Sequence, residues 1–135
     1  MGIASYVLGP LAGVVLAVGA APFLVEPPAI EVHSLTFGGE MVTQDRTVAS
    51  ESETFFARWR AEVVDVATGA AVPGCKGQGE WDYPAGRKAA TMTLPRWVGS
   101  EACTAERLPD QFYLRATWIW GDDQTGAKSR IYQRN

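Results

Sequence analysis

The side chains best suited to bind a ligand are aromatic residues in segments rich in glycine and proline. Two of the five tryptophans, Trp81 and Trp97, lie in such segments, together with Tyr83. Exposed aromatic rings stack on sugars or anchor protein interfaces, where arginine is enriched as well. The alternative is that these rings only cover the edge of a core. We expect one binding patch made of six residues: Trp81, Tyr83, Arg87, Lys88, Arg96 and Trp97.

Catalytic residues are harder to find. His33 is the only histidine, and it stands between Val32 and Ser34 with no cysteine or paired acid nearby. A lone histidine of this kind is most often a surface or strand-edge residue. The chain has no nucleophile elbow, no phosphate-binding glycine loop and no metal-ligand spacing. We therefore expect no enzyme activity, no catalytic residues, no metal and no cofactor.

Two further motifs have simple structural explanations. Gly77 and Gly79 lack the third glycine and the helix of a nucleotide-binding loop, so we expect them to let an aromatic ring lie over a strand. Asp122 and Asp123 supply few of the six to eight oxygens that calcium requires, and a hairpin turn explains them better.

Charge argues against a nucleic-acid partner. The formal net charge is -3, and the cations near the C-terminus are explained by alternating strand faces. A protein that reads a nucleic-acid groove needs a basic patch or stripe.

Cys75 and Cys103 are the only cysteines. They could be two buried thiols of a cytosolic protein, or a disulfide formed in an oxidising compartment. We favour the disulfide, because the uncharged N-terminal segment before Glu26 indicates membrane targeting. The periplasm or the cell exterior, where disulfides persist, is then the more coherent location of the domain. Such a bridge would stabilise the domain by about 3 to 4 kcal/mol.

The N-terminal segment contains no charged residue before Glu26. At 1.5 Å per residue, a helix over residues 3–25 would span roughly 34 Å, enough to cross a hydrocarbon core of about 30 Å. A cleaved signal peptide is the alternative, with a cleavage site before Ala21, but no lysine or arginine precedes the apolar run. We favour a transmembrane anchor in residues 1–28, followed by one extracytoplasmic domain in residues 29–135.

Small residues recur every four positions along the anchor. On a helix they would share one stripe, where a second membrane helix could approach closely, so self-association through this face is possible. Small residues are also common in any membrane span. The stripe consists of Ser5, Gly9, Gly13, Ala17 and Ala21.

Apolar residues after position 29 recur with a period of two. In residues 55–64 the odd positions are apolar, and in residues 112–120 the even positions are apolar. This alternation is typical of half-buried strands. We expect further strands at residues 30–37, 41–48, 75–83, 91–94 and 128–133, with turns at residues 38–39, 68–69, 84–86, 108–110 and 122–126. About seven strands in roughly 100 residues predict an all-β, antiparallel sandwich.

One motif resembles the immunoglobulin and fibronectin type III sandwiches. A turn at residues 108–110 leads into a strand that carries Tyr113 near its start, as in a tyrosine corner. The resemblance implies an immunoglobulin-like architecture over residues 30–135. The chain departs from antibody domains because no cysteine follows two residues after Tyr113. The layout is also similar to that of small, unassigned membrane-anchored proteins of bacteria and phages. Neither resemblance implies an activity.

Together these features predict a non-enzymatic interaction module of the cell envelope. We expect a single-pass protein of the inner (cytoplasmic) membrane whose C-terminal domain is periplasmic or extracellular. Its partner would be another envelope or membrane protein. The alternatives are a secreted carbohydrate-binding domain released by signal cleavage, and a small hydrolase whose site carries no recognisable motif.

Overall fold

The protein is all-β, as the period of two predicts. The structure is a computed structural model and describes residues 28–134. The elements, in chain order, are β1 (Ile30–Gly38), β2 (Met41–Val48), β3 (Thr54–Asp65), β4 (Ala71–Pro84), β5 (Gly86–Thr93), α1 (Leu94–Val98), a 3-10 turn η1 (Ala105–Arg107), β6 (Gln111–Trp120), β7 (Asp123–Lys128) and β8 (Tyr132–Gln133).

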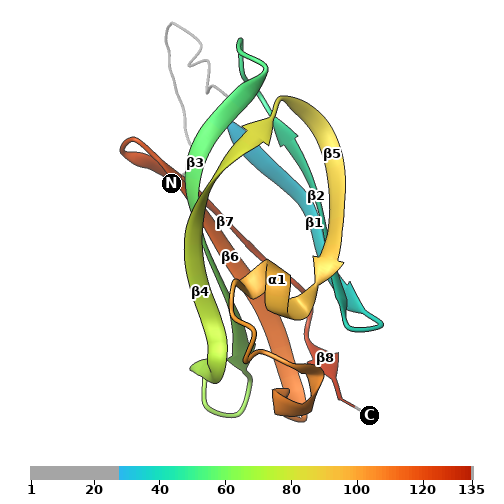
Figure 1. Ribbon diagram of the computed structural model, residues 1–135. Helices are drawn as coiled ribbons and strands as arrows, with labels where there is room; N and C mark the ends of the chain where they lie inside the picture. The colour runs from blue at the N-terminus through green and yellow to red at the C-terminus, as the bar shows by residue number, and fades with distance from the viewer. Residues whose placement is uncertain (1–27, 135) are drawn as a thin grey trace, which may run out of the picture.

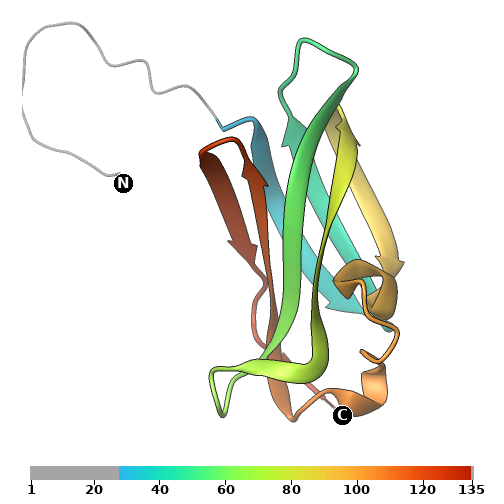
Figure 2. The same ribbon diagram turned by 60° about the vertical axis from the view of Figure 1, so that its left-hand side comes forward.

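The predicted membrane segment and its small-residue stripe at Ser5, Gly9, Gly13, Ala17 and Ala21 lie outside the described residues. Between residues 28 and 134, no helix has the length and apolar character needed to cross a bilayer. The start of β1 and the C-terminal end lie at opposite ends of the elongated domain (Figures 1 and 2).

Two antiparallel sheets pack face to face around one core (Figures 1 and 2). The first sheet has the strand order β1-β2-β5, and the second has the order β4-β3-β6-β7, with β8 pairing β6. The predicted alternation is confirmed in the two long central strands. Ala57, Ala61 and Val63 of β3 are buried, and so are Phe112 and Trp118 of β6.

The predicted strand at residues 91–94 is confirmed for residues 91–93, but β5 begins already at Gly86 and Leu94 starts a helix. The strand ends at Thr93, whose hydroxyl accepts a hydrogen bond from the backbone N–H of Arg96 (3.4 Å) and caps α1. Pro95 lies in the first turn, and Gly99 ends the helix with φ 79°. These are ordinary helix start and stop residues, but the helix between them has only five residues, too few for a period of 3.6 to show.

The C-terminal strands also differ from the prediction. A strand at residues 128–133 was expected after a turn at residues 122–126, but β7 already begins at Asp123. The turn is made by Gly121, at φ 55°, and Asp122. Residues 123–128 are too polar to show an apolar alternation, because β7 is an edge strand with mostly exposed side chains.

The domain is closed along one side and open along the other. Where the end of β1 meets the start of β6, Phe37 packs edge-on against Phe112 and Tyr132. The backbone N–H of Phe37 donates to the Tyr132 hydroxyl (2.9 Å). On the opposite side, β4 and β5 are consecutive in sequence but belong to different sheets. They diverge from the turn at Ala85, and α1 lies between them at the far end (Figure 1).

The predicted disulfide is confirmed. Cys75 of β4 and Cys103, in the segment after α1, are bonded and fully buried. Next to the bridge, Gly77 allows α1 to lie directly on β4, because a Cβ atom at this position would be 1.9 Å from the carbonyl oxygen of Val98. The disulfide and this close contact together hold α1 across the open side.

Candidate functional site

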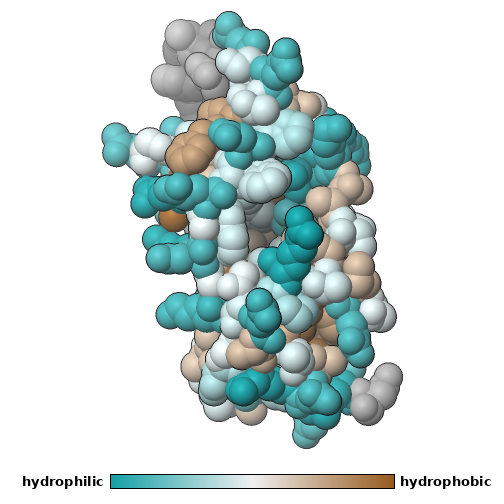
Figure 3. All heavy atoms as spheres, in the orientation of Figure 1, coloured by the Kyte–Doolittle hydropathy of each residue, from teal (hydrophilic) through white to brown (hydrophobic). Residues whose placement is uncertain are grey.

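A cleft opens between the two sheets on the side where β4 and β5 diverge. It has a volume of about 460 Å³, within the usual size of ligand sites. Figure 3 shows this face, which is hollowed between the two strands and has hydrophilic residues along much of its rim. The side chains that matter below are Gln44, Arg46, Trp59, Trp81, Tyr83, Arg96, Trp97 and Trp118.

Trp81 is the exposed aromatic residue of the cleft. It pairs with the buried Ala57 in the β3–β4 register, so both residues belong to the inner face of the sheet. Nevertheless, Trp81 is 56% exposed. The reason is that β4 is an edge strand and the opposing sheet diverges from it. An inner-face indole is therefore left uncovered at the cleft.

The floor of the cleft is made of buried aromatic rings whose polar atoms are paired. The indole N–H of Trp118 donates to the Tyr83 hydroxyl (3.0 Å), and the indole N–H of Trp97 donates to the Gln44 side-chain oxygen (3.2 Å). Tyr83 and Trp97 are only 4% and 5% exposed. These two members of the expected patch therefore form the floor, while Trp81 alone of the three aromatic residues is exposed.

Trp59 forms one wall, packed against glycines. A Cβ atom at Gly79 would be 2.8 Å from the ring of Trp59, and one at Gly99 would be 2.9 Å from it. The expectation that a strand glycine makes room for an aromatic ring is thus confirmed for Gly79. Gly77 makes room for the backbone of α1 instead.

Arg46 is the residue that the sequence did not reveal. It lies on β2, is 6% exposed, and its guanidinium carbon is 4.9 Å from the centroid of the Tyr83 ring. Its Nη1 is buried and has no hydrogen-bond partner among residues 28–134. Burial lowers the pKa of Arg46. Burial also raises the pKa of Tyr83, against smaller opposite effects of the Trp118 hydrogen bond and of Arg46.

The three cations of the expected patch lie in three different places. Lys88 pairs with Arg46 in the β2–β5 register, so it lies on the inner face, where it is exposed at the sheet edge. Arg96 lines the cleft from α1. Arg87 lies on the outer face, where it makes two hydrogen bonds to the carboxylate of Asp45 (2.8 and 3.2 Å).

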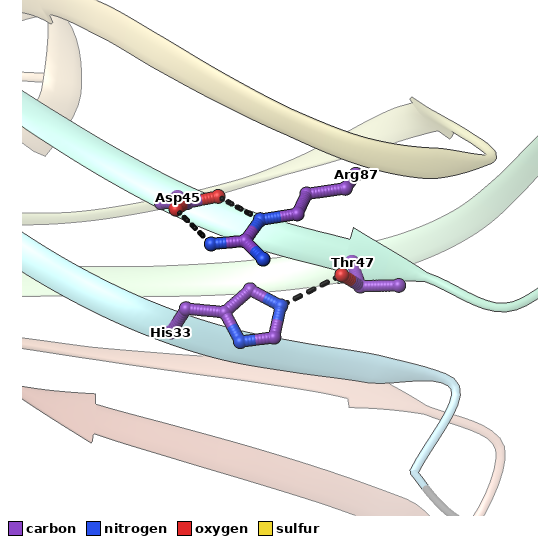
Figure 4. Close-up of polar contacts among 4 residues, drawn as sticks. All are labelled: His33, Asp45, Thr47 and Arg87. Carbon is purple, nitrogen blue, oxygen red and sulfur yellow. Dashed lines mark hydrogen bonds and ion pairs between the residues drawn. The ribbon is translucent and has the colours of Figure 1, made fainter.

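The outer face of the first sheet carries a small polar cluster, shown in Figure 4. His33 stands at a bulge in β1, and its Nε2 is 2.7 Å from the Thr47 hydroxyl. Beside it, the hydrogen bond from Arg87 is the main cause that lowers the pKa of Asp45. These four side chains, His33, Asp45, Thr47 and Arg87, come from three neighbouring strands.

This outer cluster is poorly arranged for catalysis. A hydroxyl within hydrogen-bond distance of an imidazole meets the first requirement for a nucleophile and its base. The base also needs an orienting group, but both oxygens of Asp45 are bonded to Arg87. The cluster lies on an exposed strand face and does not line the cleft. Over residues 28–134, no three potential metal ligands come together.

Comparisons with known proteins add no relative to this description. No protein-family model, no curated protein and no solved structure matches the chain.

Proposed function

We propose that this chain is a non-enzymatic interaction module that contacts another envelope or membrane protein through the cleft. In this proposal residues 1–28 anchor it in the cytoplasmic membrane, and the domain lies on the periplasmic or extracellular side. The observation that carries the proposal is Trp81, an inner-face indole that is more than half exposed beside a cleft. Partly exposed aromatic residues at the edge of a cleft are typical anchors of protein interfaces.

The disulfide supports the extracytoplasmic location. Disulfides persist in oxidising compartments and are rare in the cytosol. The shape of the domain is also compatible with an anchored module. The start of β1 lies at one end of the long axis (Figures 1 and 2). The cleft opens on the side of the domain (Figure 3), where a neighbouring protein could approach it.

We also propose that the fold belongs to the immunoglobulin-like class. The strand orders β1-β2-β5 and β4-β3-β6-β7 support this. They correspond to strands A, B and E in one sheet and to C, F and G in the other, with β4 extending the second sheet as strand C′ does. Tyr113, the residue that resembles a tyrosine corner, lies on the outer face of the second sheet. The Lys128 ammonium is 5.7 Å from the centroid of its ring.

Site-specific crosslinking in the native cells tests the cleft. A photoreactive phenylalanine analogue at position 81 should crosslink one membrane or envelope protein. The same analogue at position 56 is the matched control, because Phe56 is also about half exposed (55%) but lies on the outer face of the same sheet. Equal crosslinking from both positions, or none from position 81, would exclude the cleft as the contact surface.

Fractionation with N-terminal mass determination tests the anchor. The full-length chain should be found in the membrane fraction. A soluble form beginning at Ala21 would contradict the anchor and favour the secreted carbohydrate-binding alternative. Trp81 would then be the ring that stacks on a sugar, since aromatic rings have an apolar face that sugars can cover.

A further inference from the structure

Arg46 is unusual because it is a buried cation that forms no ion pair within residues 28–134 and whose Nη1 has no hydrogen-bond partner there. A charged group removed from water is costly unless it is paired and hydrogen-bonded. Contact with the Tyr83 ring compensates part of this cost, but Nη1 has no acceptor among the described residues. Arg46 also lines the cleft. An acceptor bound in the cleft would therefore complete the interactions of Arg46.

The charges around Arg46 favour an anionic acceptor. Lys88 lies directly across from it on β5, and Arg96 lines the cleft from α1. Like charges on opposite strands destabilise a sheet, so an anion between Arg46 and Lys88 would relieve their repulsion. Among the lining residues only Glu80 is acidic. Carboxylates and phosphates both match a guanidinium in geometry, and of the two the carboxylate is the one that an unmodified protein side chain supplies.

The remaining walls favour an apolar group next to that carboxylate. Trp59, Trp81 and Trp118 present aromatic surface to the cleft. The indole N–H groups of Trp97 and Trp118 are already bonded to protein acceptors, as described above. A sugar would bring several hydroxyl groups, and burying these without partners is unfavourable. An apolar side chain has no such requirement.

The free edge of β5 indicates how one protein segment could place both the carboxylate and the apolar side chain in the cleft. In the described part of the chain β5 pairs only with β2, so its other edge carries unpaired backbone groups beside the cleft. An extended segment can add to such an edge, and its side chains then point alternately to the two faces. Side chains two positions apart would share the face on which Arg46 lies.

We propose that the cleft binds an extended segment of the partner protein, with a carboxylate side chain paired to Arg46 and an apolar side chain, two positions along, lying against Trp81. This inference rests on the proposed function, because it names the chemistry of the partner at the same cleft. Arg46 is the specificity-determining residue.

The test uses the full-length chain in phosphatidylcholine nanodiscs, with tryptophan fluorescence as the readout. The probe is a capped peptide of sequence Glu-Ser-Leu-Ser-Leu, and its neutral twin has glutamine in place of glutamate. The acidic peptide should bind at least about tenfold more tightly than the twin, since a charge-assisted hydrogen bond is stronger than a neutral one. Arg46→Met should remove this preference.

The stability of Arg46→Met separates a binding role from a structural one. If the charge of Arg46 serves only to bind a ligand, the thermal midpoint of Arg46→Met without peptide should be equal to or above that of the wild type. The reason is that an unpaired buried charge is replaced by an apolar side chain of similar length. Arg87→Met is the matched control, since it removes one outer-face arginine and should leave peptide binding unchanged.

Each other result overturns a distinct statement. Equal binding of the two peptides, or a preference for the acidic peptide that survives in Arg46→Met, would refute the pairing of a carboxylate with Arg46. In that case the cleft would remain the contact surface if Trp81→Ala still abolished peptide binding. If an oligogalacturonate binds and neither peptide does, the partner is a glycan and the proposed function fails as well. If no probe binds, the inference is wrong, whereas crosslinking from position 81 still decides the proposed function.

Discussion

The guanidinium of Arg46 lies over the ring of Tyr83, with its central carbon 4.9 Å from the ring centroid. The two residues come from different sheets, β2 and β4, so this contact joins the sheets at the cleft. Tyr83 in turn accepts the hydrogen bond of the Trp118 indole. The Tyr83 hydroxyl is thus already bonded to a core residue. Under the inference above, the counter-charge of Arg46 comes from the bound segment.

Replacing Tyr83 with Phe should destabilise the domain. The change removes the acceptor of the Trp118 N–H, and an unpaired buried donor costs about 1 to 3 kcal/mol. Urea unfolding measures the difference. Tyr113→Phe is the control, because Tyr113 lies on the outer face of β6 and should change the free energy of unfolding little. Equal effects of the two substitutions would contradict the role of the Tyr83 hydroxyl.

Alkaline pH should destabilise the domain through the same residue. Burial raises the pKa of Tyr83 above its ordinary value of 10.0. Above that pH the unfolded chain loses a proton that the folded chain keeps, so the free energy of unfolding falls as pH rises. Below pH 10.0 the stabilising contribution of neutral Tyr83 to the free energy of unfolding is fully present. The Tyr83→Phe variant should show a smaller loss between neutral pH and pH values above 10.0, measured by thermal melting; an identical loss would contradict this assignment.

Trp97 and Trp81 should respond differently to truncation. Trp97→Ala removes a buried ring at the floor of the cleft and should cost about 3 to 5 kcal/mol. Trp81→Ala removes an exposed ring and should weaken partner binding with little change in melting temperature. Trp118→Ala provides the reference for a core tryptophan. A Trp81→Ala variant that melts as early as Trp118→Ala would assign Trp81 to the core.

Loss of the disulfide should destabilise the domain by about 3 to 4 kcal/mol on the loop-entropy model, given a sequence separation of 28. The double variant Cys75→Ser, Cys103→Ser should therefore show a lower midpoint of denaturant unfolding. In protein isolated from its native compartment, thiol labelling under denaturing conditions should find no free cysteine. Two labelled thiols would place the domain in a reducing compartment and reverse the proposed topology.

Gly77→Ala should displace α1. A Cβ atom at Gly77 would be 1.9 Å from the Val98 carbonyl oxygen. Because this oxygen belongs to the backbone of α1, either α1 or β4 has to move to make room. We expect a loss of about 1 to 3 kcal/mol, typical of overpacking. Gly38→Ala is the control, because a Cβ atom there would meet nothing within 4 Å. If both variants have the same free energy of unfolding as the wild type, the position of α1 does not depend on its close contact with Gly77.

The sequence determined the strands of the core. A strand alternates its side chains between two faces, so the apolar positions of residues 55–64 and 112–120 identified both the element and its buried face. It also supplied the cysteine pair, because only one pairing is possible with two cysteines. Both conclusions depend on local pattern or on counting, and neither requires a knowledge of distant contacts.

The tertiary structure decided what lies at the cleft. In β2 both faces carry polar residues, so alternation could not tell that Gln44 and Arg46 point inward while Asp45 points outward. That choice depends on how β2 pairs with β5 and on which sheet lies opposite. For the same reason the expected patch was divided, with Arg87 on the outer face and Trp97 in the core. Exposure of Trp81 follows from the divergence of β4 and β5, a relationship between two sheets that no local pattern encodes.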